Sequence, residues 1–315
     1  MGENASKIGK ELENFADLLV SHFGWEILVR NQEITCTKSS HKKKTHGIDL
    51  LCKFYNPYLD GKQAVVIECK NWKMCNINNK EIQGWITELI NSIDCAQTAD
   101  ELKGLDYSGV ISNTTGLLLI NASEGWNEAS FYKYLKTISI PNRRIPINIY
   151  IAANDKTEMW VSLLQKIEKD YIRDFSFIYP SINGNDMKKI KTFTLDAMFS
   201  KYVFAESTYE KKEEKNGMPY SVPCKQSIMF FLDDICSDNF KYAWSMFKHF
   251  QFQGKDKYTF VFYPRSKNDI ELINSTFISS LNAIEHPISQ DEVNKINIEF
   301  IENKNLNTVY SGGLL

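Results

Sequence analysis

Apolar residues in the first part of the chain follow helical spacing first and strand spacing afterwards. Residues 8–23 carry an apolar stripe at intervals of three and four, which predicts an amphipathic helix that ends at Gly24. Residues 25–30 and 33–38 are strand-like. Residues 48–54 and 63–70 are two further apolar strands, and the Pro and Asp-Gly turn residues between them predict an antiparallel hairpin.

Helix and strand patterns continue to alternate up to about residue 170. Helices are expected at residues 80–94, near 129–137 and at 156–170, and buried strands at 116–122 and 147–154. This order predicts an α/β fold with a mixed central sheet flanked by helices. We place this first domain at residues 1–172.

Residues 173–315 repeat the mixture with different spacing and predict a second α/β domain for specificity, oligomerisation or partner docking. Strands are expected at 174–180, 189–195, 226–232, 257–264 and 296–302, and helices near 239–250 and 268–285. The charged segment "ESTYEKKEEKNG", residues 206–217, is interpreted as a solvated loop and a proteolysis site. One aromatic stripe at helical spacing is assigned to the core, with partner binding as the alternative: Phe240, Trp244, Phe247 and Phe250.

The composition limits the classes of protein to which the chain can belong. With 315 residues and 43% hydrophobic content, the chain can bury a core in each of two domains. A run of about 18 apolar residues is missing, which excludes a membrane span. The seven cysteines are odd in number and form no C-x-x-C pair, which favours reduced thiols in the cytoplasm and argues against structural zinc. His41 and His46 lack metal-ligand spacing and are interpreted as polar loop residues.

Charge is distributed unevenly along the chain. The net charge of −2 excludes a globally basic nucleic-acid binder. The segment from Cys36 to Lys73, however, contains eight lysines and three acidic residues, which gives it a net charge of +5. Such a basic patch can bind phosphates even when the rest of the protein is not basic.

Candidate catalytic residues lie within this basic segment, residues 36–73. Side chains alternate along a strand, so Glu68 and Lys70 share one face of the strand at residues 63–70. The chain has five E-x-K triplets, but only this one lies on an apolar strand with an acid, Asp49, on the strand before it. In the predicted hairpin Asp49 approaches Glu68. Two carboxylates and one ammonium suit Mg²⁺ and phosphodiester hydrolysis. A structural ion pair is the alternative, although an exposed pair contributes at most about 1 kcal/mol.

This arrangement resembles the PD-(D/E)XK nuclease superfamily, and most closely the Mrr-type restriction endonucleases and archaeal Holliday-junction resolvases. The helix segment "GKELENFADLLVSHFGW" supplies Gly9, Glu13 and Gly24 followed by Trp25, and "GIDLL" and "IECKNWK" are similar to the two catalytic strands. The resemblance covers about the first 95 residues motif by motif. The superfamily's proline before the aspartate is replaced by Ile48.

The resemblance implies a set of site residues. The catalytic set would be Glu13, Asp49, Glu68, Lys70 and Gln83. Asp49, Glu68, the backbone carbonyl of Cys69 and, as a possible fourth ligand, Glu13 would hold Mg²⁺, for which Mn²⁺ would substitute. Glu11 competes with Glu13, because both border the apolar stripe of the helix. The spacing to Gly9 and Gly24 favours Glu13.

The resemblance also implies a function. We expect a Mg²⁺-dependent DNA endonuclease of restriction or anti-phage type, acting as a homo-oligomer, with a second regulatory subunit, or both. The alternative is a non-catalytic DNA-binding or scaffold protein on a nuclease-like fold; the complete charged set argues against it. Six side chains are candidates for binding DNA phosphates: Lys42, Lys43, Lys44, Lys73, Arg143 and Arg144.

Overall fold

The computed structural model divides the chain into two compact units, which we describe separately. The structure describes residues 2–106, 110–140, 143, 145–180, 187–283 and 288–304. The first unit ends at Val161 and the second spans Ser162–Lys304. The division falls inside helix α4 (Asn154–Asp170), N-terminal to the predicted boundary at residue 172. No helix of the described part is long and apolar enough to cross a membrane.

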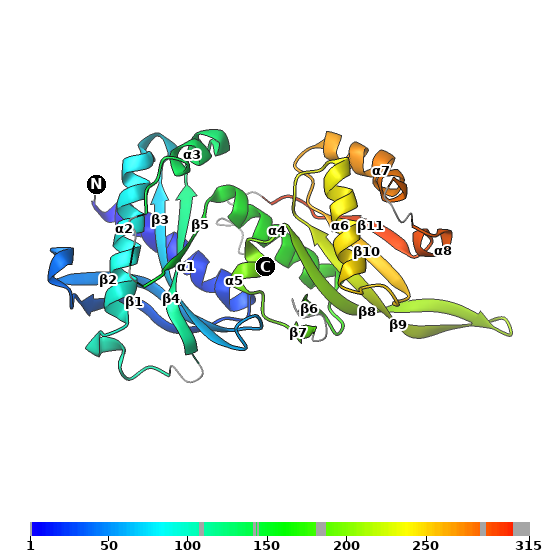
Figure 1. Cartoon of the computed structure of the whole chain (residues 1–315), viewed down its shortest axis with the longest axis horizontal. Helices are drawn as coiled ribbons and strands as arrows, with labels where there is room; N and C mark the ends of the chain where they lie inside the picture. Colours follow the sequence, from blue (N-terminus) through cyan, green and yellow to red (C-terminus); the bar gives the residue numbers. More distant parts are fainter. Residues whose placement is uncertain are drawn as a thin grey trace. The chain divides into compact units, whose positions relative to one another are not determined.

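The first unit is built on a five-stranded mixed sheet in the order β1-β2-β3-β4-β5 (Figure 1). Strands β1, β2 and β3 pair in antiparallel fashion, and β3, β4 and β5 pair in parallel. The predicted hairpin is therefore present as β2 and β3. The strand bounds are β1 Glu26–Thr35, β2 Thr45–Asn56, β3 Gly61–Trp72, β4 Val110–Ala122 and β5 Asn148–Ala152.

One difference from the sequence analysis concerns β1, which was expected as two strands, at residues 25–30 and 33–38. The structure has a single strand over Glu26–Thr35. Its middle contains Asn31 with φ 48°, in the left-handed region that asparagine adopts more readily than most residues. The irregular backbone at this residue is therefore accommodated within one strand rather than ending it.

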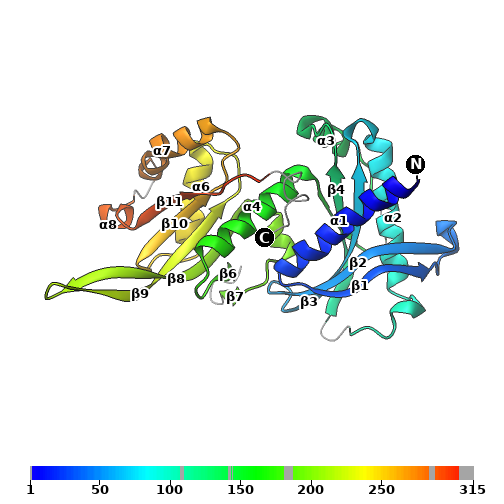
Figure 2. The ribbon, with the colours of Figure 1, turned by 180° about the vertical axis from the view of Figure 1, so that it is seen from behind.

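Helices cover both faces of the first sheet. Helix α1 (Gly2–His22) contacts β1, β2 and β3 and lies in front of the sheet in Figure 2. Helix α2 (Asn79–Ala96) contacts the sheet through β1 to β4 and lies in front in Figure 1. The mixed α/β architecture with flanking helices is thereby confirmed. The shorter helices are η1 Ser39–His41, η2 Met74–Asn76, η3 Asp100–Leu102 and α3 Glu128–Leu135.

Helix α2 forms because its sequence supplies both a cap and an apolar face. The side chain of Asn78 accepts hydrogen bonds from the backbone N–H groups of Lys80 and Glu81, which would otherwise be unpaired in the first helical turn. Its apolar residues recur at helical spacing and pack against Leu51, Val66 and other strand residues. The buried hydrophobic residues of α2 are Ile82, Trp85, Ile86, Leu89, Ile90, Ile93 and Cys95.

The close approach of α2 to β4 depends on Gly116, and this contact gives a stability prediction. A Cβ at Gly116 would lie 2.8 Å from Cδ1 of Ile93 and 2.9 Å from Cδ2 of Leu89. Gly116→Val should therefore lower the free energy of unfolding by about 1–3 kcal/mol through overpacking. Urea denaturation followed by circular dichroism would measure it.

Gly84 is the matched control for this prediction. It lies within α2, and a Cβ at that position meets no atom within 4 Å. Gly84→Ala should raise stability by about 0.5–1 kcal/mol, because glycine is unfavourable inside a helix. A Gly116→Val protein as stable as the wild type would show that α2 can move away from β4 at no cost.

The second unit contains a six-stranded mixed sheet in the order β11-β10-β9-β8-β6-β7. Strands β9, β10 and β11 are parallel neighbours, and the remaining neighbours are antiparallel. The strand bounds are β6 Ser176–Tyr179, β7 Lys188–Ile190, β8 Tyr202–Lys215, β9 Met218–Phe231, β10 Lys257–Phe262 and β11 Ile296–Phe300. The helix bounds are α5 Leu195–Met198, α6 Ser237–His249, α7 Lys267–Asn282 and α8 Gln290–Val293.

Aromatic residues fill the core of the second unit. Phe240, Trp244 and Phe247 of α6 are fully buried, and Phe250 packs against the same cluster. Several rings from the sheet and from α7 join them, with the Phe240 and Phe277 ring centroids 5.3 Å apart and nearly perpendicular. The core interpretation of this aromatic stripe is confirmed.

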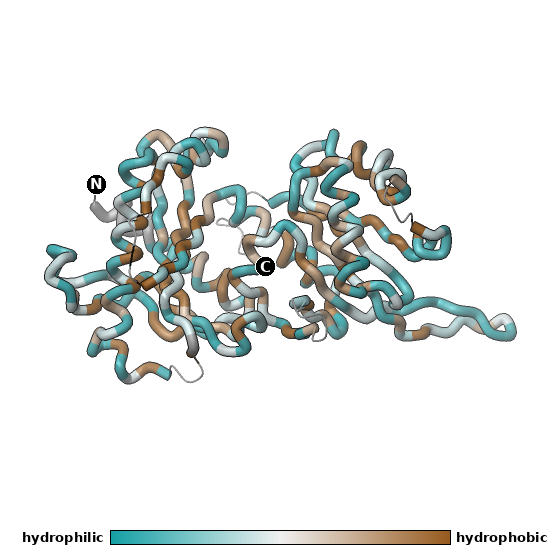
Figure 3. The backbone as a smooth tube through the Cα atoms, in the orientation of Figure 1, coloured by the Kyte–Doolittle hydropathy of each residue, from teal (hydrophilic) through white to brown (hydrophobic). Residues whose placement is uncertain are grey.

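The charged segment at residues 206–217 is not a loop, so this prediction was wrong. Strand β8 pairs with β9 along its whole length, from Tyr202 opposite Phe231 to Lys215 opposite Met218. Asn216 and Gly217 form the turn with φ 55° and 76°, as a two-residue hairpin turn requires. Pairing between β8 and β9 holds the segment extended without a hydrophobic face, so both faces can remain polar. Figure 3 shows the largely hydrophilic end of this hairpin.

Candidate active site

Asp49 and the Glu68-Cys69-Lys70 segment meet where β2 and β3 lie side by side. The register pairs Leu50 with Ile67, which brings the residues on either side of that pair together. Oδ2 of Asp49 accepts a hydrogen bond from the backbone N–H of Cys69 at 2.7 Å. Nζ of Lys70 donates to Oε1 of Glu68 at 2.5 Å. The structure therefore brings two carboxylates and one ammonium close enough to interact electrostatically where β2 and β3 pair.

Burial disfavours the ionised forms of the acidic residues in this cluster. Glu68 is only 8% exposed, and burial, together with the charge of Asp49, raises its pKa to about 7 although Lys70 opposes the shift. Burial also raises the pKa of Asp49, against the effects of the Cys69 N–H and Lys70. Burial opposes the charge on Lys70, but the carboxylates of Glu68, Asp49 and Glu88 together outweigh it, and the pKa of Lys70 is raised. Lys70 is therefore held as an ammonium.

Helix α1 brings a third carboxylate into electrostatic range. Glu13 is half-buried, and burial and the charge of Asp49 raise its pKa, while a hydrogen bond from the Asn31 side chain opposes the shift. Glu11 is exposed, so Glu13 is the one of the two that faces the cluster. Asn31 was missed by the sequence analysis, because only its left-handed backbone in β1 reveals a special position.

Helix α2 contributes two further side chains. Oε1 of Gln83 accepts a hydrogen bond from the backbone N–H of Ser139 at 3.0 Å, which ties α2 to the segment after α3. Glu88 was not predicted, yet its charge acts on both Glu68 and Lys70. Nothing in the sequence distinguishes Glu88 from an ordinary solvent-facing charge on the helix. A catalytic role for Gln83 remains a prediction.

The predicted DNA-binding residues lie in different settings. Lys42 and Lys44 are exposed in the segment that joins β1 to β2, and Nζ of Lys43 lies 2.7 Å from Oε1 of Glu88. Glu88 is close enough to raise the pKa of Glu68, so its ion-pair partner Lys43 also lies near the acidic cluster. Nζ of Lys73 lies 2.8 Å from Oε1 of Glu124.

The two arginines of the predicted set are placed differently. Arg143 is ion-paired with Asp94 at the end of α2. Arg144 lies outside the described residues. Both remain predicted DNA-binding residues.

The donor atoms of the cluster fit a hard divalent cation. The carboxylates of Asp49, Glu68 and Glu13 and the backbone carbonyl of Cys69 all offer oxygen, the ligand type that Mg²⁺ prefers. The pKa values of all three acids are raised, so the positive charge of Lys70 does not fully offset the cost of burying their ionised forms. A cation beside them would favour those charged forms.

A mixed sheet that carries an acid on one strand and an E-x-K triplet on the next defines a nuclease domain of the PD-(D/E)XK type. Residues 1–156 match the family model of the GAPS4 protein PD-(D/E)XK nuclease domain, so this part of the chain belongs to the PD-(D/E)XK nuclease superfamily. Nucleases of this superfamily generally depend on divalent metal ions. No curated protein and no solved structure matches the chain. The closer likeness to Mrr-type enzymes and Holliday-junction resolvases stays a prediction.

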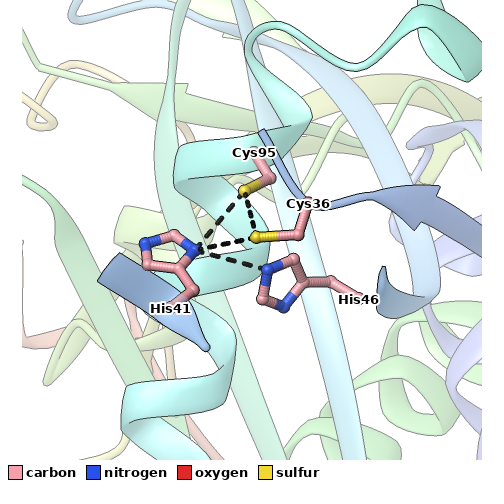
Figure 4. Close-up of side chains that lie close together, drawn as sticks. All are labelled: Cys36, His41, His46 and Cys95. Atoms are coloured by element: carbon pink, nitrogen blue, oxygen red, sulfur yellow. Dashed lines mark hydrogen bonds between the residues drawn. The ribbon is translucent and has the colours of Figure 1, made fainter. Parts of the chain in front are cut away.

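The interpretation of His46 as a polar loop residue was wrong, whereas His41 does lie in the connection between β1 and β2, at the end of the short helix η1. His46 lies in β2 and is 4% exposed, and Nδ1 of His41 lies 3.3 Å from its Nε2. Cys36, just after β1, and Cys95, in α2, complete a compact group with the two rings (Figure 4). The sequence lacked the short C-x-x-C spacing that would have revealed such a group.

Proposed function

We propose that this protein is a Mg²⁺-dependent DNA endonuclease that cleaves phosphodiester bonds in anti-phage defence or restriction. The observation that carries the proposal is the convergence of Asp49, Glu68 and Lys70 in a domain of the PD-(D/E)XK superfamily. The match to an anti-phage family supports the defence role. We expect the protein to act in the cytoplasm.

Each residue of the cluster has a proposed role. The carboxylates of Asp49 and Glu68, with the Cys69 carbonyl and Glu13, would hold Mg²⁺, and Mn²⁺ would substitute. When bound, the ion supplies a Lewis acid that stabilises negative charge on the phosphate. Lys70, kept protonated and oriented by Glu68, would position the attacking water and contact the scissile phosphate.

Digestion of three DNA substrates tests the proposal. Linear, circular and single-stranded DNA would each be incubated with the full-length protein and Mg²⁺ or Mn²⁺. Cleavage of covalently closed circles is the expected result, because an endonuclease needs no free end. Cleavage of linear DNA alone would contradict the endonuclease assignment. If no substrate is cut and calorimetry shows metal-independent DNA binding, the scaffold alternative is correct.

We also propose that Lys42, Lys43 and Lys44 bind DNA phosphates. A triple alanine variant should bind DNA more weakly and less salt-dependently, with the slope of log K against log salt reduced by about 0.9 for each phosphate that is no longer bound. Fluorescence anisotropy between low and moderate salt would measure both effects.

The control for the lysine prediction removes the same number of charges elsewhere. Lys211, Lys212 and Lys215 lie in the charged hairpin strand β8. Their triple alanine variant should retain the wild-type slope. Equal reductions in affinity in the two triple variants would mean that only net charge matters.

Control by a partner is the last element of the proposal. A nuclease in the host cytoplasm must be restrained, so we propose that the protein forms a homo-oligomer, binds a regulatory subunit, or does both. The domain we expect at residues 173–315 would supply the docking surface or the DNA specificity. Light scattering of the protein alone, and mixed with products of neighbouring genes, tests this. A monomer that cuts DNA freely would contradict it.

A further inference from the structure

Four potential metal ligands meet at one end of the first unit, three from residues 36–46 and one from α2. Cys36 follows β1, His41 ends η1, His46 lies in β2 and Cys95 lies in the last turn of α2. One ligand atom from each residue lies within 4.8 Å of every other. Figure 4 shows both sulfur atoms and the His46 ring directed toward Nδ1 of His41.

Four of the six distances between these atoms match a tetrahedral zinc site. Bonds of about 2.3 Å to sulfur and about 2.05 Å to nitrogen, at tetrahedral angles, place sulfur atoms about 3.8 Å apart, sulfur and nitrogen about 3.6 Å apart and nitrogens about 3.3 Å apart. The two Sγ atoms are 3.8 Å apart. Nδ1 of His41 lies 3.6 Å from Sγ of Cys36 and 3.5 Å from Sγ of Cys95. It lies 3.3 Å from Nε2 of His46.

Hydrogen bonding accounts for these contacts poorly. A neutral imidazole nitrogen either donates one proton or accepts through one lone pair. Nδ1 of His41 nevertheless has three polar neighbours, at 3.3, 3.5 and 3.6 Å. One bond can satisfy one of these contacts, and thiols are weak partners. A cation at the centre explains all of them, because each ligand atom then points its lone pair inward.

The surroundings also suit a structural metal. Cys95 is fully buried and His46 is 4% exposed, so the site is closed to solvent on that side. Oδ2 of Asp94 lies 3.7 Å from Nε2 of His41, the ring nitrogen opposite the cluster. This carboxylate lies beyond hydrogen-bond distance, and its negative charge favours a cation bound on the other side of the ring.

We infer that Cys36, His41, His46 and Cys95 bind one structural Zn²⁺ ion. Two thiolates and two imidazoles in tetrahedral arrangement suit Zn²⁺, and four protein ligands leave no open position for chemistry. The ion joins the lysine loop, residues 36–44, to the end of α2. The inference rests on these four side chains and is independent of the proposed nuclease activity.

Metal analysis of the full-length protein, purified without chelator, tests the inference. Inductively coupled plasma mass spectrometry should find about one zinc per chain. Cys36→Ser and Cys95→Ser should each lose most of that zinc. Cys75→Ser and Cys236→Ser, at exposed thiols, should keep it. Glu68→Ala should also keep it, which separates this site from the candidate active site.

Two measurements on the wild type avoid variants that fail to fold. X-ray absorption at the zinc edge should show two sulfur and two nitrogen neighbours. A thiol-modifying reagent should release zinc to a metal-sensitive dye and lower the melting temperature. A protein that contains no zinc and does not take up Zn²⁺ or Co²⁺ after reduction would overturn the inference. A Cys36–Cys95 disulfide, found by mass spectrometry of unreduced peptides, would overturn it as well.

Discussion

Replacing Glu68 or Lys70 with alanine is expected to lower the rate of Mg²⁺-dependent DNA cleavage at least about 100-fold, the loss typical of removing one group that stabilises the transition state. Glu68→Ala removes a proposed metal ligand and the partner that orients Lys70. Lys70→Ala removes the only ammonium hydrogen-bonded to Glu68 in the described part of the chain. Single-turnover cleavage of a labelled duplex would measure both rates, with circular dichroism to confirm folding.

The chain offers a matched control for these two variants. Glu213 and Lys215 form another E-x-K triplet, on the exposed hairpin strand β8. Glu213→Ala and Lys215→Ala should therefore cleave DNA at the wild-type rate. Full activity in Lys70→Ala would defeat the proposed role of the cluster. Equal losses of activity in the hairpin variants would point to a general effect of charge.

Divalent metal is expected to stabilise the protein more at pH 8 than at pH 5. Without metal, the pKa of Glu68 is raised from 4.5 to about 7. The folded state therefore disfavours ionised Glu68, at a cost of about 3 kcal/mol by roughly 1.36 kcal/mol per pH unit. That cost is absent below pH 4.5, grows as the pH rises to about 7 and persists above it. A bound cation offsets it.

The measurement is a melting curve with and without Mg²⁺ or Mn²⁺ at each pH. Offsetting even about 1 kcal/mol would raise the melting temperature by about 2–4 °C in a unit of this size. At pH 5, protons compete with the cation for Glu68, so the increase should be smaller. Dialysis rather than a chelator would remove the divalent ions, so that the proposed zinc stays bound.

Two variants define what would contradict this prediction. Glu68→Gln and Asp49→Asn each remove a proposed ligand charge and should abolish the metal-induced increase. Glu206→Gln, in the second unit, alters a carboxylate that is ion-paired with Lys189 and Lys255, and should leave the increase unchanged. An increase of equal size at pH 5 and pH 8, or one retained in Glu68→Gln, would place the metal elsewhere.

Much of the first unit was predictable because local patterns and long-range packing agree there. The hairpin of β2 and β3 follows from two apolar runs around a Pro and Asp-Gly turn, and antiparallel pairing then brings Asp49 to the Cys69 backbone. The cap at Asn78 and the apolar face of α2 are equally local signals. The hairpin of β8 and β9 was missed, because its charged residues outweighed the Asn216-Gly217 turn signal.

The sequence by itself determined the superfamily, the mixed sheet and the three charged residues of the central strands, since strand alternation and hairpin pairing act over short distances. Only the tertiary structure decided that Glu13 rather than Glu11 faces Asp49, that Glu88 acts on Glu68, and that Cys95 meets Cys36, 59 residues away in the chain. Those contacts depend on how α1 and α2 are rotated against the sheet. Packing of the whole core sets that rotation, and spacing along the chain does not encode it.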